Sequence, residues 1–134
     1  MTGFYIGGGS GKSKNGEDLS EGISGEAITA YQPVALIDGE LFVGDNADET
    51  HCNRIVGLAL NSATGAGQEV DVQSSGEVTN SGWSFTPGQR LFLGPNGAII
   101  TSISPSDTLM VPIGHAIDND TIFIDIKPSI RRNC

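Results

Sequence analysis

Glycine and proline interrupt this chain so often that no stretch as long as an ordinary helix keeps a helical apolar period without one of them. The 134 residues include 19 Gly and 6 Pro, and both residue types disfavour the interior of a helix. β-branched apolar residues dominate instead, with 14 Ile and 7 Val against 8 Leu. Because such side chains suit a pleated surface, the sequence predicts an all-β fold.

Short apolar runs alternate with turn residues at short, even intervals, a spacing typical of small barrels and sandwiches. Asp38-Gly39 and Gly94-Pro95-Asn96-Gly97 lie between such runs and predict hairpins, because Asp-Gly and Asn-Gly accept positive φ. We therefore expect a compact β-barrel or β-sandwich of short antiparallel strands. The expected strands cover residues 27–31, 34–37, 40–43, 54–60, 69–73, 89–93, 98–102, 110–117 and 121–127.

A weak internal repeat runs through these strands. In both halves of the chain a hairpin is followed by the pattern apolar-Gly-x-Ala-apolar, with its glycine at Gly57 in the first half and at Gly114 in the second. Two similar β-meanders on a common core would produce this pattern, with the two glycines at bulges or at close backbone approaches. Chance similarity between Gly-rich β sequences is the alternative.

Three regions of different composition divide the chain. Residues 1–24 read as a flexible, Gly-rich N-terminal arm, residues 25–130 as the all-β domain, and residues 131–134 as a short basic tail. The ends are the candidate partner-binding parts. Phe4, Tyr5 and Ile6 form an apolar tip on the arm, and Arg131 and Arg132 are basic residues in an acidic protein. Simple disorder at both ends is the competing interpretation.

The excess of acidic over basic residues disfavours some classes of binding partner. Sixteen acidic residues stand against seven basic ones, which gives a formal net charge of −9. A negative field of this size opposes nucleic-acid binding and docking on an anionic membrane, so neither is expected. Cys52 and Cys134 match no metal or redox spacing, and we expect reduced thiols in a protein made in a cytoplasm.

No motif assembles catalytic or ligand-binding chemistry. The stretch Gly7–Ser13 resembles a phosphate-binding loop, but Ile6 stands where its first glycine is required. Asp45, Asp48 and His115 are available for an enzyme on a β-barrel, without supporting spacing, and His51-Cys52 reads as an ordinary loop. Trp83 is not grouped with Phe4 and Tyr5 as a stacking face. We therefore expect no catalytic residues, no metal, no cofactor and no enzymatic activity.

The order of several short motifs carries a family resemblance over residues 23 to 130. These motifs are Gly25-Glu26-Ala27-Ile28, Pro33 to Leu36, Arg54 to Ala59, Gly65-x-Gly67, Pro87 to Leu93, Ile113 to Ala116 and Ile122 to Pro128. In this order they resemble small all-β virion proteins of tailed bacteriophages, a group that includes capsid decoration (cement) proteins and β modules of tails or fibres.

The resemblance implies a structural protein, not an enzyme, at the capsid surface of a virion. Its expected partners are the major capsid protein, which it would clamp between neighbouring subunits, and further copies of itself in a homotrimer. It carries no catalytic residues over to this chain, and residues 1–22 lie outside it. The alternative function is a receptor- or carbohydrate-binding β module of a phage tail or head fibre.

Overall fold

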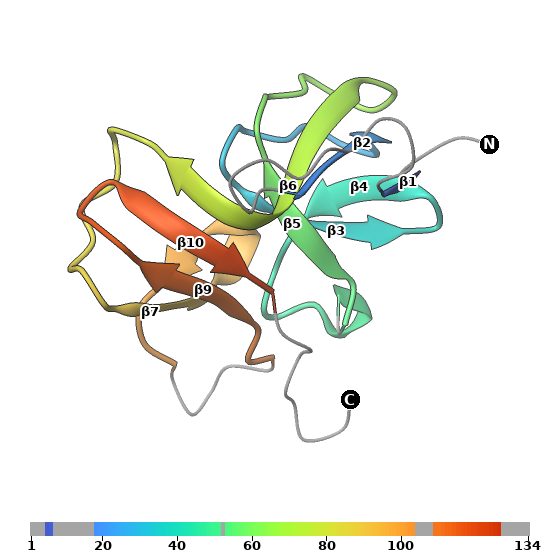
Figure 1. Cartoon of the computed structure of the whole chain (residues 1–134). Coiled ribbons are helices and arrows are strands. Elements are labelled where there is room, and N and C mark those ends of the chain that lie inside the picture. Colours follow the sequence, from blue (N-terminus) through green and yellow to red (C-terminus); the bar gives the residue numbers. More distant parts are fainter. Residues whose placement is uncertain (1–4, 7–17, 52, 104–108, 127–134) are drawn as a thin grey trace.

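The computed structural model describes residues 5–6, 18–51, 53–103 and 109–126. Within these ranges the fold is all-β, as the abundance of Ile and Val predicts: an antiparallel sheet curls into a half-barrel (Figure 1). The elements are β1 (Tyr5–Ile6), β2 (Asp18–Ile23), β3 (Pro33–Ile37), β4 (Glu40–Val43), η1 (Glu49–His51), β5 (Ile55–Ala59), β6 (Glu69–Thr79), β7 (Arg90–Leu93), η2 (Pro95–Gly97), β8 (Ile99–Ile100), β9 (Pro112–Ala116) and β10 (Thr121–Asp125).

The strands follow the order β4-β3-β5-β6-β10-β9-β7-β8, and each neighbouring pair is antiparallel. The long strand β6 curves between the two groups of strands seen in Figure 1, so that its first part pairs with β5 and its second part with β10. β2 pairs with the first part of β6, and β1 pairs with β2. β6 is therefore the element that joins the two sides of the molecule.

The predicted repeat is present as two units with the same topology. The first unit, β3 to β6, has the strand order β4-β3-β5-β6, and the second unit, β7 to β10, has the order β8-β7-β9-β10. Val34 pairs with Gly57 in the first unit, and Leu91 pairs with Gly114 in the second. The same number of residues separates Val34 from Leu91 and Gly57 from Gly114. In both units the register of the strand pair shifts immediately after the first residue, Val34 or Leu91. The expectation of bulges at these glycines is confirmed.

Hydrogen bonds repeat with the same offset. The Ala59 N–H donates to the Gln32 carbonyl at 2.9 Å, and the Ala116 N–H donates to the Gln89 carbonyl at 2.8 Å. Each of these glutamines also accepts at its side-chain oxygen from the N–H three residues earlier, at 2.9 and 3.2 Å. The two units therefore share their turns as well as their strands.

Both predicted hairpins are confirmed. Asp38 and Gly39 have φ of 51° and 83°, the combination that a two-residue loop needs to match the twist of its strands. In the second hairpin, Asn96 and Gly97 have φ of 50° and 78° within η2. Local turn chemistry therefore fixes the position of one hairpin in each unit.

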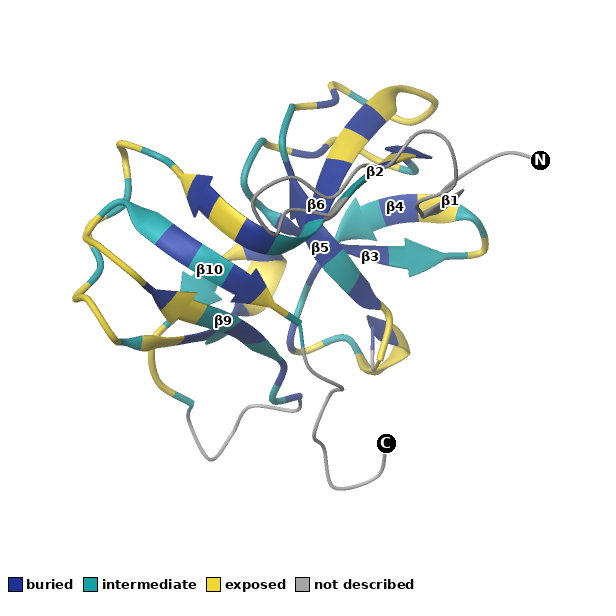
Figure 2. Ribbon diagram, in the orientation of Figure 1, coloured by how far each residue is buried: buried dark blue, intermediate teal, exposed yellow. Residues whose placement is uncertain are grey.

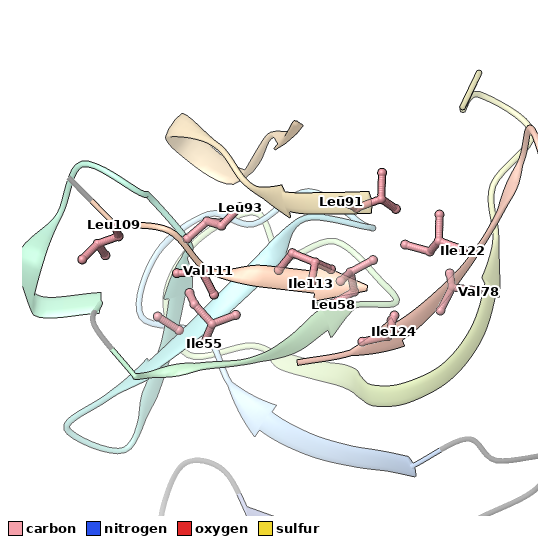
Figure 3. Close-up of a cluster of buried hydrophobic side chains, with 11 residues drawn as sticks. Ile55, Leu58, Val78, Leu91, Leu93, Leu109, Val111, Ile113, Ile122 and Ile124 are labelled. Carbon is pink, nitrogen blue, oxygen red and sulfur yellow. The ribbon is translucent and has the colours of Figure 1, made fainter. Parts of the chain in front are cut away.

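Buried side chains form two clusters. Figure 2 marks the buried residues in dark blue along the ribbon. The larger cluster joins both units, because Ile55 and Leu58 of the first lie among the leucines and isoleucines of the second (Figure 3). The smaller one belongs to the first unit and the segments beside it. The larger cluster contains Ala35, Ile55, Leu58, Val78, Leu91, Leu93, Leu109, Val111, Ile113, Ile122 and Ile124, and the smaller contains Ile28, Val34, Leu41, Ala59, Ala63, Val70 and Val72.

Three segments differ from the sequence-based expectation. The strand expected over 27–31 does not form: Ile28 makes an isolated bridge with Ala63, and Tyr31, with φ of 73°, reverses the chain before β3. The strand expected over 69–73 continues to Thr79, because its second part pairs with β10. Residues 18–23, which the sequence places in the arm, form β2 and pair with β6 along their whole length.

Gln73 supports the bend in β6. Its side chain is buried, and its Nε2 donates to the carbonyls of Ser75 at 3.0 Å and Glu77 at 2.9 Å. The pairing of β2 with β6 shifts register at the same place, where Asp18 lies opposite Ser75 and Leu19 opposite Gln73. A side-chain amide thus supplies hydrogen bonds to main-chain carbonyls where the strand changes its neighbours.

Candidate functional site

The candidate partner-binding residues lie at the ends of the chain. Phe4, Arg131 and Arg132 are outside the described residues. The backbone of Tyr5 and Ile6 forms β1, with Tyr5 opposite Glu21 and Ile6 opposite Ser20. β1 pairs with β2 and, within the described ranges, with no other strand, so it is an edge of the sheet. Tyr5 and Ile6 are thus associated with the sheet through their main chain.

Asp45, Asp48 and His51 form a self-contained loop beside η1. The Asp45 N–H donates to Nδ1 of His51 at 3.0 Å, and Nε2 of His51 lies 3.4 Å from the Asp48 carboxylate. The His51 residue is 5% exposed. Because Nδ1 accepts a hydrogen bond, the neutral ring carries its proton on Nε2, where it faces Asp48. Both ring nitrogens of His51 therefore stabilise the loop, and we interpret the role of this histidine as structural.

The Asp48 carboxylate also accepts from Thr50, at 2.6 Å from the hydroxyl and 2.9 Å from the N–H. The Thr50 hydroxyl is the largest influence on the pKa of Asp48, and together with the Thr50 N–H and His51 it lowers that pKa below 3.8, against the opposing effect of burial. The loop thus favours the charged carboxylate.

His115 lies apart from this loop, on the outer face of β9. It stands opposite Arg90 on β7 and opposite Phe123 on β10, and its ring lies 5.6 Å from that of Phe123 at an interplanar angle of 32°. A shallow hollow of about 370 Å³ is lined by His115 and Arg90 together with Asp125. In the part of the chain that the structure describes, no three His, Cys, Asp or Glu side chains gather as a metal site would require.

A second hollow, of about 400 Å³, is lined by three aromatic residues. The Tyr31 and Trp83 rings lie 5.6 Å apart at an angle of 70°, and the Trp83 and Phe85 rings 5.7 Å apart at 46°. All three side chains are partly buried against the larger core cluster, and all three line the hollow. The rings are arranged as interacting aromatic pairs. Packing against the core holds them in place, and one side of them remains open to solvent. We call this feature the aromatic hollow.

Trp83 belongs to an aromatic group in which only Phe85 is close to it in the sequence. Its ring partners are Tyr31 and Phe85, and the expectation that it is not grouped with Phe4 and Tyr5 stays a prediction. Two main-chain hydrogen bonds hold the connection that carries it: the Asn80 N–H donates to Asp120 O at 2.9 Å, and the Phe85 N–H to Asn119 O at 2.8 Å. The short spacing of Trp83 and Phe85 was the one local signal of this cluster, and Tyr31 comes from a distant turn.

Comparison with known proteins leaves the family of this chain open. No protein-family model matches it, and no curated protein shows significant sequence similarity to it. Among the described residues, no helix has the length and apolar character needed to cross a membrane. The geometry of the chain itself therefore carries the functional argument.

Proposed function

We propose that this chain is a structural virion protein of a tailed bacteriophage that decorates and stabilises the capsid. In this role it binds between neighbouring subunits of the major capsid protein and associates with itself as a homotrimer. It acts by contact and not by catalysis, through its apolar N-terminal tip and its basic C-terminal tail. The proposal rests on the resemblance of residues 23 to 130 and on the geometry of β1.

The pairing of β1 with β2 is the observation that carries the proposal. β1 is an edge of the sheet, and an edge strand presents unpaired N–H and C=O groups to which a strand of another protein can add. The connection between Ile6 and Asp18 covers residues 7–17 and contains five glycines and no aliphatic or aromatic residue. From this composition we expect a flexible link, which would let the tip reach a partner surface at small cost to the rest of the fold.

Shared burial of the two units gives the proposed protein a stable body from which to make these contacts. The larger core cluster takes side chains from both units (Figure 3), so the relative position of the units is fixed by packing. Weak contacts from several symmetry-related copies would then add through effective concentration.

The test measures occupancy of capsids by the full chain and by a variant that lacks residues 1–9. Purified heads of the phage that encodes the chain, stripped of this protein, are incubated with each form and sedimented. The full chain is expected to saturate the heads at a fixed ratio to the major capsid protein. The truncated chain is expected to keep its fold and to lose at least about 90% of its occupancy, because the apolar anchor is gone.

A matched control replaces Gly7, Gly8 and Gly9 by Ser, which keeps the length of the arm and its apolar tip, and it should occupy heads as the full chain does. Arg131→Ala with Arg132→Ala should weaken binding and reduce its dependence on salt. Equal occupancy by the truncated and full chains would overturn the role of the tip. Failure of every form to bind heads, with saturable binding to host cells, would favour the receptor-binding alternative.

A further inference from the structure

We propose that the aromatic hollow is a binding site for a neutral sugar, a pyranose at the end of a glycan or within it. The site involves the three aromatic residues and the amide and hydroxyl side chains around them. The described residues that line it include neither strand residue of β1, so the proposal does not depend on the capsid contacts proposed above.

The aromatic part of the site is already ordered. Trp83 stands between Tyr31 and Phe85 with ring separations of 5.6 and 5.7 Å, and all three residues pack against the core. Such rings keep their positions without a ligand, so binding costs little side-chain entropy. A pyranose has an apolar face made of C–H groups, and this face packs well on a half-buried ring.

The polar part of the site matches the hydroxyl groups of a sugar. Gln32, Asn80 and Ser84 line the hollow beside the rings. The side-chain oxygen of Asn80 accepts from the Gly82 N–H at 3.1 Å, which leaves its NH2 group without a hydrogen-bond acceptor among the described residues. Amides and hydroxyls both donate and accept, as the hydroxyl groups of a sugar do, so the hollow combines apolar walls with a few polar groups.

The charge of the protein and of the hollow favours a neutral sugar over an anionic or a cationic ligand. The chain carries a net charge of −9, and none of the described residues that line the aromatic hollow is charged at neutral pH. An anionic ligand would meet an unfavourable field without a local cation, and a cationic ligand would find no carboxylate within the lining. The volume of about 400 Å³ falls near the lower end of small-molecule sites, which suits one or two sugar rings.

Trp83 is the sole tryptophan of the chain, so its fluorescence reports directly on the site. The experiment titrates the full chain with the methyl glycosides of glucose, galactose, mannose and N-acetylglucosamine, and with β-linked disaccharides of these sugars. At least one is expected to change the emission of Trp83 saturably, with Kd of roughly 1 mM, which is typical of a small, shallow site. Methyl glucuronide, with its carboxylate, is expected to bind at least about tenfold more weakly.

Ala98→Arg is the blocking variant, because Ala98 is exposed and lines the hollow. A long side chain here fills the hollow without removing a core contact, so Kd should rise at least about tenfold, as measured by calorimetry. Ala66→Arg is the matched control: it makes the same change at an exposed alanine outside the lining and should leave Kd within about twofold. Absence of saturable binding by every neutral sugar, or equal binding by the two variants, would overturn the proposal.

Discussion

Gly57 and Gly114 let neighbouring strands approach more closely than a side chain allows. A Cβ atom at Gly57 would overlap the carbonyl oxygen of Gln73, and one at Gly114 would overlap that of Phe123. The obstacle in both cases is backbone, which cannot rotate away as the end of a side chain can. The same steric requirement is therefore present once in each unit, next to the bulge.

We expect Gly57→Ala and Gly114→Ala each to lower the free energy of unfolding by about 2–4 kcal/mol, because a strand must shift to accept the methyl group. Gly65→Ala is the control, since a Cβ there meets no atom within 4 Å, and it should change stability by less than about 0.5 kcal/mol. Urea denaturation followed by circular dichroism measures all three. A loss at Gly65 as large as at the other two glycines would contradict the steric explanation.

Asp48 makes one part of the stability dependent on pH. Because its pKa in the folded protein is lowered from 3.8, the charged carboxylate stabilises the fold above about pH 3.8, and this contribution disappears as the pH falls through the lower, folded pKa. Asp48→Asn should therefore be less stable than the original chain at pH 7 and equally stable near pH 2. Thermal unfolding from pH 7 to pH 2 tests this, and a stability gap that widens in acid would contradict it.

At the level of elements, local chemistry predicted the hairpins well. Asp38-Gly39 and Asn96-Gly97 carry their own information, because few residues accept positive φ and these dipeptides do. The alternation of short apolar runs with turn residues likewise predicted seven strands close to their observed bounds, namely β3, β4, β5, β7, β8, β9 and β10. In each case the signal lies within a few residues of the element that it specifies.

The second part of β6 and the whole of β2 could not be predicted in this way. Residues 73–76 are polar or glycine, a composition typical of a turn. They continue as a strand because the Gln73 side chain supports the bend and the residues beyond it pair with β10. β2 contains only two apolar residues, Leu19 and Ile23, and its hydrogen-bonding partner β6 lies far away in the sequence. Strands that depend on distant partners leave little local pattern.

The aromatic hollow could not be predicted from the sequence for a similar reason. It needs the turn at Tyr31, whose positive φ is unusual for an aromatic residue, and it needs the connection from Asn80 to Phe85 to be held by the turn between β9 and β10. No spacing in the chain encodes the meeting of these two segments. The composition indicated only that aromatic residues are few.

At the level of the whole molecule, the two units bury their equivalent positions differently. Leu58 faces Pro33 in the first unit as His115 faces Arg90 in the second. Leu58 is fully buried against the second unit, whereas His115 is exposed. At this position the second unit covers the first unit. The equivalent position of the second unit carries a polar side chain that is exposed to solvent.

This asymmetry predicts opposite effects of exchanging the two residues. Leu58→His should lower the free energy of unfolding by about 3–4 kcal/mol, because it places a polar ring in the core and removes apolar contacts. His115→Leu, at the equivalent exposed position, should change it by less than about 1 kcal/mol. Chemical denaturation of both variants measures the difference. Similar losses at the two positions would contradict the assigned environments.

The course of β6 has a consequence for how this protein loses its structure. A repeated unit often forms a domain that melts independently of its copy. Here β6 gives its first part to one unit and its second part to the other, and the larger core cluster draws on both. Because neither unit can open without exposing the apolar surface of the other, we expect the two halves of the repeat to unfold together in one cooperative transition.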